Sequence, residues 1–255
     1  MSNKLAVFDI DGTLLNRARN VLPSTLEAIQ QLQSQGVHVA IATGRNYKMA
    51  KWVIEATNIH DYVVCTGSAL YIADQLVDAR TLDVGDVRRF MAYTQSLGVN
   101  FMAESADELY AENADDPLLQ RVLRGCRTTV LDAPGYGLQH EIVQGLALLN
   151  EQQELAAPEF KHLKFKRFSK YGVDVLPADV SKAGGIARLA THLNVDAQDV
   201  VAFGDNQNDK EMLSAAGIGI AMGHASSDVQ AQADYVTDDC DNDGIYHGLQ
   251  HIGWL

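Results

Sequence analysis

The chain has 255 residues, of which 47% are hydrophobic, and its formal net charge at pH 7 is −13. This length suits one large domain or a core with a smaller second domain, and the apolar fraction is enough for a sizeable core. The negative charge opposes nucleic acid or an anionic membrane as a partner, because both require a basic surface. The negative charge still allows a small phosphorylated substrate, provided that a metal ion and a few cationic side chains lie near its binding site.

Three cysteines, Cys65, Cys126 and Cys240, lie far apart and form no CxxC pair. Such a sparse, odd set indicates a reducing compartment without a disulfide framework. The first residues lack the pattern of a signal or transit peptide, and no apolar run approaches membrane-spanning length. We therefore expect a cytoplasmic protein with no membrane partner, and the sequence does not indicate its oligomeric state.

Short apolar runs alternate with amphipathic stretches at both ends of the chain. In the N-terminal part, strands are predicted at 4–10, 37–44 and 62–67, with helices at 23–36 and 47–58. In the C-terminal part, strands are predicted at 199–205, 218–223 and 233–237, with helices at 181–195, 208–217 and 243–255. Strand–helix–strand repetition with glycine at the strand ends indicates a parallel sheet covered by helices.

The middle of the chain has a different character, with helices predicted at 86–98 and 116–125 and strands at 100–105, 147–151 and 161–177. We expect an inserted α/β domain at 82–180, flanked by a core made of 1–81 and 181–255. The 161–177 stretch carries lysines in an otherwise acidic chain. Lysines protect edge strands from aggregation, and we favour that interpretation over a cationic contact with substrate.

Carboxylates follow two of the predicted core strands. Asp9 and Asp11 end the first strand, and Asp205 ends the strand at 199–205. Parallel strands present their carboxyl ends at one edge of the sheet, so these groups are expected to converge. Mg²⁺ prefers a few carboxylates together with waters and substrate phosphate. The alternative is that the closely spaced aspartates only form a solvated turn, where aspartate is common.

Phosphate-binding groups are predicted at the same edge. The hydroxyl of Thr43 and the amides at Thr43 and Gly44 lie where the second strand opens into a turn. Lys182 stands at the start of a helix and could hold a carboxylate and an incoming phosphate together. For each, a structural role remains open: a capping threonine in a strand-to-helix turn, or a solvated lysine in a first helical turn.

The segments DIDGTLLN, ATGR, Lys182 and GDNQND resemble, in order, the four motifs of the haloacid dehalogenase (HAD) superfamily of phosphotransferases. The C-terminal part from VSKAGGIARL onwards is similar to the Cof-type sugar-phosphatase branch. The resemblance implies a Rossmann-like parallel-sheet core with an inserted α/β cap that selects the substrate. One departure is Thr66-Gly67-Ser68, where this branch usually has Asn-Gly-Ala.

The resemblance also implies a role for each matching residue. Asp9 would be the nucleophile that forms an aspartyl-phosphate, and Asp11 the acid and then the base. Mg²⁺ would be held by the Asp9 carboxylate, the Asp11 backbone carbonyl and Asp205, with Asp209 supporting the site.

The phosphate would be held by Thr43, Gly44, Lys182 and Asn208. We add Arg45, next to the phosphate loop, as a candidate for contact with the substrate.

These observations predict a Mg²⁺-dependent phosphatase of small phosphorylated metabolites, sugar phosphates foremost. A phosphomutase with a similar core and cap is the alternative enzyme, and it would need a bisphosphate activator. The non-enzymatic alternatives are a sugar-phosphate sensor and a signalling receiver. A receiver must keep its aspartyl-phosphate, whereas Asp11 would promote its hydrolysis.

Overall fold

The computed structural model describes residues 3–255 and divides into two compact units. The first contains residues up to 44 together with 51–77 and 181–255, and the second contains 45–50 and 78–180. The short stretch 45–50 is thus grouped with the inserted region rather than with the core, where the sequence placed it.

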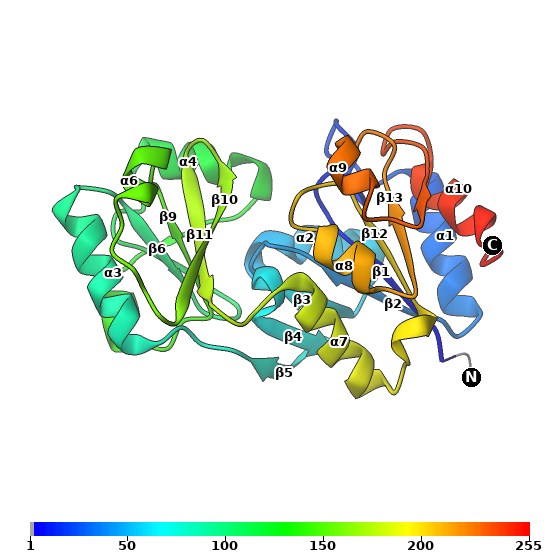
Figure 1. Cartoon of the computed structure of the whole chain (residues 1–255), viewed down its shortest axis with the longest axis horizontal. Coiled ribbons are helices and arrows are strands. Elements are labelled where there is room, and N and C mark those ends of the chain that lie inside the picture. The colour runs from blue at the N-terminus through cyan, green and yellow to red at the C-terminus, as the bar shows by residue number, and fades with distance from the viewer. Residues whose placement is uncertain (1–2) are drawn as a thin grey trace. The chain divides into compact units, whose positions relative to one another are not determined.

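The first unit is built on an eight-stranded sheet in the order β14-β13-β12-β1-β2-β3-β4-β5 (Figure 1). Its strands are β1 (Leu5–Phe8), β2 (His38–Ala42), β3 (Asp61–Val64), β4 (Ala69–Ile72), β5 (Gln75–Ala79), β12 (Val200–Gly204), β13 (Ile218–Ala221) and β14 (Tyr235–Val236). Neighbours from β14 to β3 pair in parallel, whereas β3 and β4 pair antiparallel. The predicted Rossmann-like parallel sheet is therefore confirmed.

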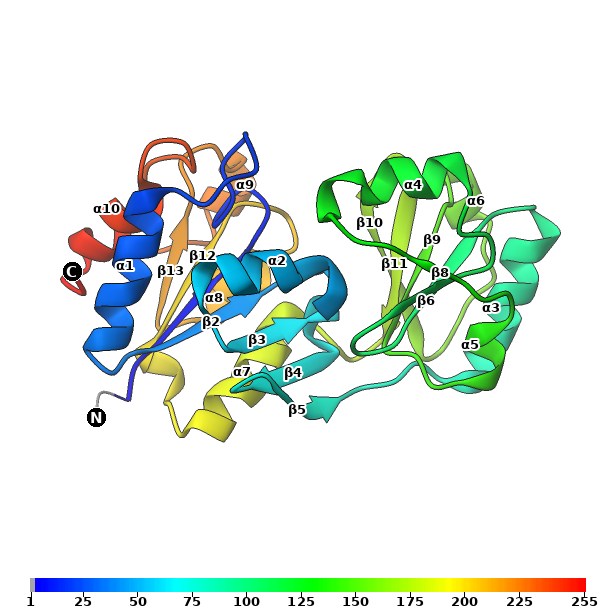
Figure 2. The same cartoon turned by 180° about the vertical axis from the view of Figure 1, so that it is seen from behind.

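Helices cover both faces of this sheet. They are α1 (Pro23–Ser34), α2 (Tyr47–Thr57), α7 (Lys182–Leu193), α8 (Lys210–Ala215), α9 (Ser227–Gln230) and α10 (Gly244–His251). Helices α7 and α8 pack together, and so do α1 and α10 (Figures 1 and 2). The buried cluster beneath α7 joins Leu189 to Val7 and Ala202 on the central strands. Such a dry interior fixes the strand ends that carry polar groups.

The second unit contains a six-stranded sheet in the order β10-β11-β9-β6-β7-β8. Its strands are β6 (Phe101–Glu104), β7 (Leu109–Ala111), β8 (Leu131–Asp132), β9 (Gln144–Ala147), β10 (Leu163–Ser169) and β11 (Gly172–Pro177). Its helices are α3 (Val84–Ser96), α4 (Pro117–Leu123), α5 (Tyr136–Gln139) and α6 (Glu151–Leu155). The lysine-rich strand β10 lies at the edge of the sheet, as predicted.

Each face of the second sheet has its own apolar cluster. Phe90 of α3 packs with Phe101 and Val175 on one face, and Leu119 of α4 packs with Met102 and Leu146 on the other. The strand predicted at 147–151 is wrong in its position along the chain, because β9 ends at Ala147 and a helix begins at Glu151. Asn150 forms a capping box with Gln153, and that local pairing starts the helix.

Candidate active site

Three adjacent parallel strands bring the predicted site residues together. Strand β1 lies between β12 and β2, with Phe8 opposite both Phe203 and Ile41. Asp9 therefore leaves the sheet beside the end of β12, and its backbone N–H donates to the carbonyl of Phe203 over 3.0 Å. The convergence expected from strand order is present, because the registers place these strand ends level.

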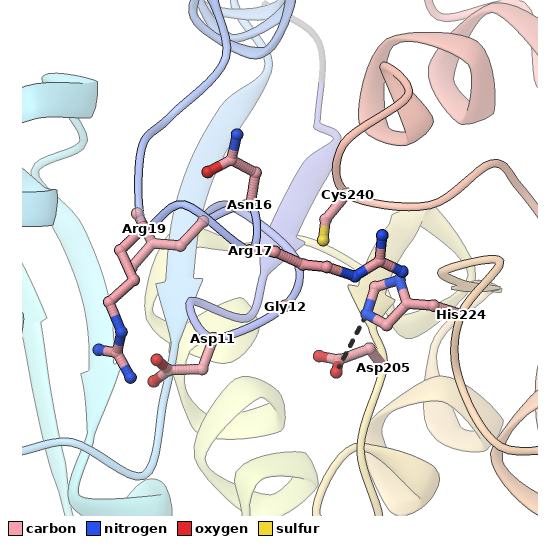
Figure 3. A pocket seen from close by; sticks show the side chains of 9 residues that line it. Asp11, Gly12, Asn16, Arg17, Arg19, Asp205, His224 and Cys240 are labelled. Atoms are coloured by element: carbon pink, nitrogen blue, oxygen red, sulfur yellow. Dashed lines mark ion pairs between the residues drawn. The ribbon is translucent and has the colours of Figure 1, made fainter. Parts of the chain in front are cut away.

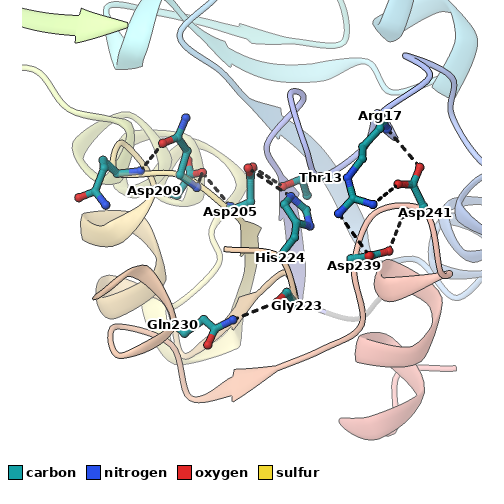
Figure 4. Close-up of polar contacts among 11 residues, drawn as sticks. Thr13, Arg17, Asp205, Asp209, Gly223, His224, Gln230, Asp239 and Asp241 are labelled. Atoms are coloured by element: carbon teal, nitrogen blue, oxygen red, sulfur yellow. Dashed lines mark hydrogen bonds and ion pairs between the residues drawn. The ribbon is translucent and has the colours of Figure 1, made fainter. Parts of the chain in front are cut away.

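Gly12 lets the loop after β1 turn tightly beside Asp205. Its φ is +85°, and a Cβ built there would lie 2.4 Å from Asp205 Oδ2. Thr13, the next residue, donates its hydroxyl proton to Asp205 Oδ1 over 3.2 Å (Figure 4). Gly12 and Thr13 thus fix the position of the Asp205 carboxylate. Glycine is required at position 12 because any side chain would occupy the space of that carboxylate.

Lys182 is fully enclosed at the start of α7. Ser181 caps that helix by accepting from the backbone N–H of Gly184, and the chain so held directs Lys182 inward. Its Nζ lies 2.5 Å from Asp9 Oδ1 and 2.8 Å from Asp209 Oδ1. Burial by itself lowers the pKa of this amine, but the carboxylates of Asp209 and Asp9 outweigh burial and raise it. The ammonium is therefore retained in a dry setting.

Asp209 ties the lysine to the loop that follows β12. It is completely buried, and its second oxygen, Oδ2, accepts from the backbone N–H groups of Asp205 and Asn206 over 3.0 Å each. Both carboxylate oxygens are thus engaged, one by Lys182 and the other by the loop. This arrangement suits the supporting role expected for Asp209. Asn208 lies half-buried in the same turn.

Asp9, Asp205 and Asp209 form an acidic cluster that is suited to a cation. Each offers a carboxylate oxygen within 4.8 Å of the others. Burial raises the pKa of Asp9 to about 8, with Asp209, Asp205 and Asp11 adding to the effect of burial and Lys182 opposing it. Burial, with Asp209 adding to it, likewise raises the pKa of Asp205 to about 6. One ammonium does not neutralise three carboxylates, and a hard cation would restore their charged forms.

The predicted phosphate loop follows β2. Thr43 is buried, its backbone N–H donates to the carbonyl of Val63 over 2.9 Å, and its own carbonyl accepts from Thr66 over 3.0 Å. Gly44 follows as the last residue of this part of the first unit. Arg45 belongs to the second unit, where its guanidinium donates to the carbonyl of Met49 over 3.2 Å.

A cavity of ≈ 300 Å³ opens beside Asp11 and Asp205 (Figure 3). Asp11 is exposed there, which leaves its carboxylate accessible from solvent. His224 and Arg17 also line this cavity, and neither was predicted as a site residue from the sequence. His224 Nε2 lies 3.5 Å from Asp205 Oδ2, and it follows the end of β13, so strand-end position was the available signal.

Arg17 holds the loop after β1 against the loop before α10. Its Nη1 lies 2.8 Å from Asp241 Oδ2, and its Nη2 lies 3.5 Å from Asp239 Oδ2 (Figure 4). The arginine is exposed, so the net energy of these ion pairs is small, but they hold a side chain that lines the cavity. No sequence signal pointed to this pairing, because the partners lie in distant loops.

Comparisons with known proteins agree with the fold and identify the family. The haloacid dehalogenase-like hydrolase family matches residues 6–249. YkrA of Bacillus subtilis is 34% identical over 100% of both chains. HMP-PP phosphatase of Yersinia enterocolitica is 31% identical over 99% of this chain and 95% of the relative.

Solved structures show the same similarity over the whole chain. A protein of Geobacillus kaustophilus HTA426 has a TM-score of 0.92 at 33% identity, covering 100% of both chains. The HAD subclass IIB sugar phosphatase BT4131 has a TM-score of 0.89 at 25% identity, covering 99% of this chain and 100% of that one.

The fold and the clustered aspartates define a hydrolase with a Rossmann-like core and a second α/β unit. The chain belongs to the haloacid dehalogenase-like hydrolase family. The predicted enzyme class, a HAD-type phosphatase, is confirmed by these relatives. Across residues 3–255, no helix combines the length and apolar character needed to cross a bilayer.

Proposed function

We propose that this chain is a Mg²⁺-dependent phosphatase that hydrolyses small phosphorylated metabolites through an aspartyl-phosphate on Asp9. The observation that carries the proposal is the buried Lys182 ammonium, held between Asp9 and Asp209. Such a fixed positive charge beside a buried carboxylate suits the transfer of a phosphoryl group, whose oxygens carry negative charge. A sugar phosphatase and an HMP-PP phosphatase among the similar proteins support a small phosphorylated substrate.

In the first step, an Asp9 carboxylate oxygen attacks the phosphorus and the bond from phosphorus to the substrate oxygen breaks. Asp11 gives its proton to that departing oxygen, so that an alcohol leaves. The exposed position of Asp11 suits this task, because the group it protonates must enter and leave through solvent. Lys182, together with the Thr43 hydroxyl, the Gly44 backbone N–H and the amide of Asn208, would bind the phosphoryl oxygens. The backbone N–H of Thr43 is not included, because it already donates to the carbonyl of Val63.

In the second step, Asp11, now a carboxylate, takes a proton from water as that water attacks the phosphorus. The bond between Asp9 and phosphorus breaks, inorganic phosphate leaves, and Asp9 is regenerated. Splitting hydrolysis in this way replaces one difficult displacement by two easier ones.

Asp9 and Asp205, with the Asp11 carbonyl, would hold the Mg²⁺, and Asp209 would orient the loop that carries Asp205. When bound, the ion would neutralise charge on the transferring phosphoryl group and keep Asp9 ionised. The fit rests on the donor set, because Asp9, Asp205 and Asp209 each offer a carboxylate oxygen within 4.8 Å of the others.

We assign substrate selection to the inserted residues 82–180, which lie in the second unit, and include Arg45 as a candidate for substrate contact. Arg45 is buried within that unit although it follows Gly44 directly in the chain. A guanidinium so close in sequence to the phosphate loop suits recognition of a second polar or anionic group.

The test is release of inorganic phosphate from a panel of sugar phosphates, nucleotides and pyridoxal phosphate, with Mg²⁺ or with EDTA. Asp9→Asn keeps the shape of the side chain and removes the nucleophile, so release should vanish. Asp11→Asn should slow both steps by about 10²- to 10⁴-fold. Metal-independent release, or full activity in Asp9→Asn, contradicts the proposal. If no substrate releases phosphate, but phosphoryl transfer appears once a sugar bisphosphate is added, the enzyme is a phosphomutase.

A further inference from the structure

A left-handed turn follows β3, immediately behind the proposed phosphate loop. Cys65, Thr66 and Gly67 have φ values of +52°, +56° and +100°. Glycine adopts such angles freely, but a β-branched threonine rarely does. A strained conformation of this kind persists only where the surrounding structure determines it, and such turns concentrate at functional sites.

One side of this turn contacts the phosphate loop. The Thr66 backbone N–H donates to the Thr43 carbonyl over 3.0 Å. Thr66 is 2% exposed, and its Oγ1 lies 3.4 Å from the place where a Cβ on Gly44 would stand. The turn therefore places the Thr66 N–H against Thr43 and the Thr66 hydroxyl close to Gly44, in the loop that we propose for phosphate binding.

The other side of the turn contacts the start of α7, which carries Lys182. A Cβ on Gly67 would lie 2.1 Å from the Ser181 carbonyl oxygen, and a Cβ on Gly185 would lie 2.8 Å from Gly67 Cα. Two glycines thus allow the backbones of the turn and the helix to touch. Arg188, three residues after Gly185 on α7, donates from its guanidinium to the Gly67 carbonyl.

We propose that the turn 65–67 is a positioning element, held in place by Arg188, that sets the distance between the Thr43–Gly44 loop and the Lys182 ammonium. These are two of the proposed phosphate-binding groups, so the inference rests on the proposed function. A relaxed turn would either move the Thr66 N–H from Thr43 or separate Gly67 from Ser181. Arg188 is a positioning residue, because it acts through the Gly67 carbonyl.

The test compares two variants on the helix side with matched controls. Arg188→Met keeps the length of the side chain and removes the donors, and Arg188→Lys restores one donor. Gly67→Ala adds a methyl group against Ser181. Gly253→Ala is the control, because Gly253 also has a positive φ, +72°, but a Cβ there meets nothing within 4 Å. Arg89→Met is the second control, since Arg89 also donates from a helix to a backbone carbonyl, that of Glu159.

The readouts are the affinity for inorganic phosphate with Mg²⁺, measured by calorimetry, and kcat and KM of the whole enzyme. Arg188→Met and Gly67→Ala should each weaken phosphate binding about tenfold, or about 1.4 kcal/mol. Arg188→Lys should recover part of the affinity, and both controls should bind as the wild type does.

Unchanged phosphate affinity in Arg188→Met and Gly67→Ala overturns the inference, and so does an equal loss in Gly253→Ala. If Gly67→Ala fails to fold, the Arg188 pair decides the question alone. A wild-type protein that neither binds nor releases phosphate instead overturns the proposed function, and the inference with it.

Discussion

The Lys182 ammonium lies 2.5 Å from Asp9 Oδ1, although 173 positions separate the two residues in the chain. Lys182 begins α7 and Asp9 follows β1, so the contact depends on the packing of that helix against the central strands. Both side chains are buried, and each compensates the charge of the other. Removing Lys182 would leave the carboxylates of Asp9 and Asp209 without their cation in a dry site, whereas removing Asp9 would leave Lys182 paired with Asp209.

Lys182→Met should therefore lose both stability and activity. We expect the free energy of unfolding to fall by about 3 kcal/mol, because the carboxylates of Asp9 and Asp209 stay buried without their cation. We expect kcat to fall by about 10²- to 10³-fold, as for other fixed charges that stabilise a transition state. Urea unfolding and phosphate release measure the two effects.

Lys51→Met is the matched control for this change. Lys51 is exposed and lies 4.0 Å from Glu55 on α2, so its loss should cost no more than about 0.5 kcal/mol. An equal loss of stability in the two variants would contradict a special role for the Lys182 pair.

Magnesium should stabilise the folded protein through Asp205. At a free Mg²⁺ concentration of about 100 times its dissociation constant, the free energy of unfolding should rise by about 2.7 kcal/mol. Asp205→Asn should remove most of this gain, which a thermal melt with and without Mg²⁺ would detect.

A second possible cation cluster, Asp83, Asp86 and His162, provides the control for this experiment. Asp83→Asn should leave the gain from Mg²⁺ intact, because Asp86 already accepts from Arg89 and from the backbone of His162. Retention of the full gain in Asp205→Asn, together with its loss in Asp83→Asn, would place the metal in the second unit instead.

Gly12→Ala should disturb the same carboxylate without changing any charge. The new methyl group would lie within 2.4–2.9 Å of the three carboxyl atoms of Asp205, so the carboxylate must move. A displacement of this size should lower kcat/KM by about 100-fold and abolish the thermal gain from Mg²⁺. Gly253→Ala has a similar backbone cost without the collision, and comparable losses in it would contradict the explanation.

The second unit should lose stability as the pH rises. Burial raises the pKa of the Asp174 carboxyl from 3.8 to about 7, against the opposing effect of Lys166. Because the folded pKa lies above the unfolded one, the folded state binds more protons between these values. The stabilisation is complete below the unfolded pKa and is lost as the pH rises through about 7.

Asp174→Asn should flatten this dependence. Between about pH 5 and pH 8, the wild type should lose about 2 kcal/mol more than the variant. Some slope should remain, because burial raises the pKa of Glu104 in the same unit, with Asp174 adding to the effect. Urea unfolding at both pH values measures the change, and Asp115→Asn at an exposed position is the control. If the free energy of unfolding changes equally with pH in the wild type and in Asp174→Asn, Asp174 is not the source of the pH dependence.

Much of the core followed from local sequence pattern. An apolar run that ends in Asp9 and an apolar run that ends in Asp205 predict buried strands with polar ends, and parallel pairing then brings those ends level. The second unit was less readable. At 147–151 the apolar residues Ala147 to Leu149 resembled a strand, but the capping box at Asn150 determined the local structure.

The sequence by itself determined which chemical groups stand at the strand ends, because hydrophobic periodicity and glycine placement act over a few residues. Tertiary structure alone decided that Lys182 is buried between Asp9 and Asp209. It left no room for a side chain at position 12, because the Asp205 carboxylate lies there. It also decided that Thr66 adopts a left-handed conformation against Thr43. Burial, pKa and backbone strain arise from contacts between distant segments, and no local pattern in the sequence encodes them.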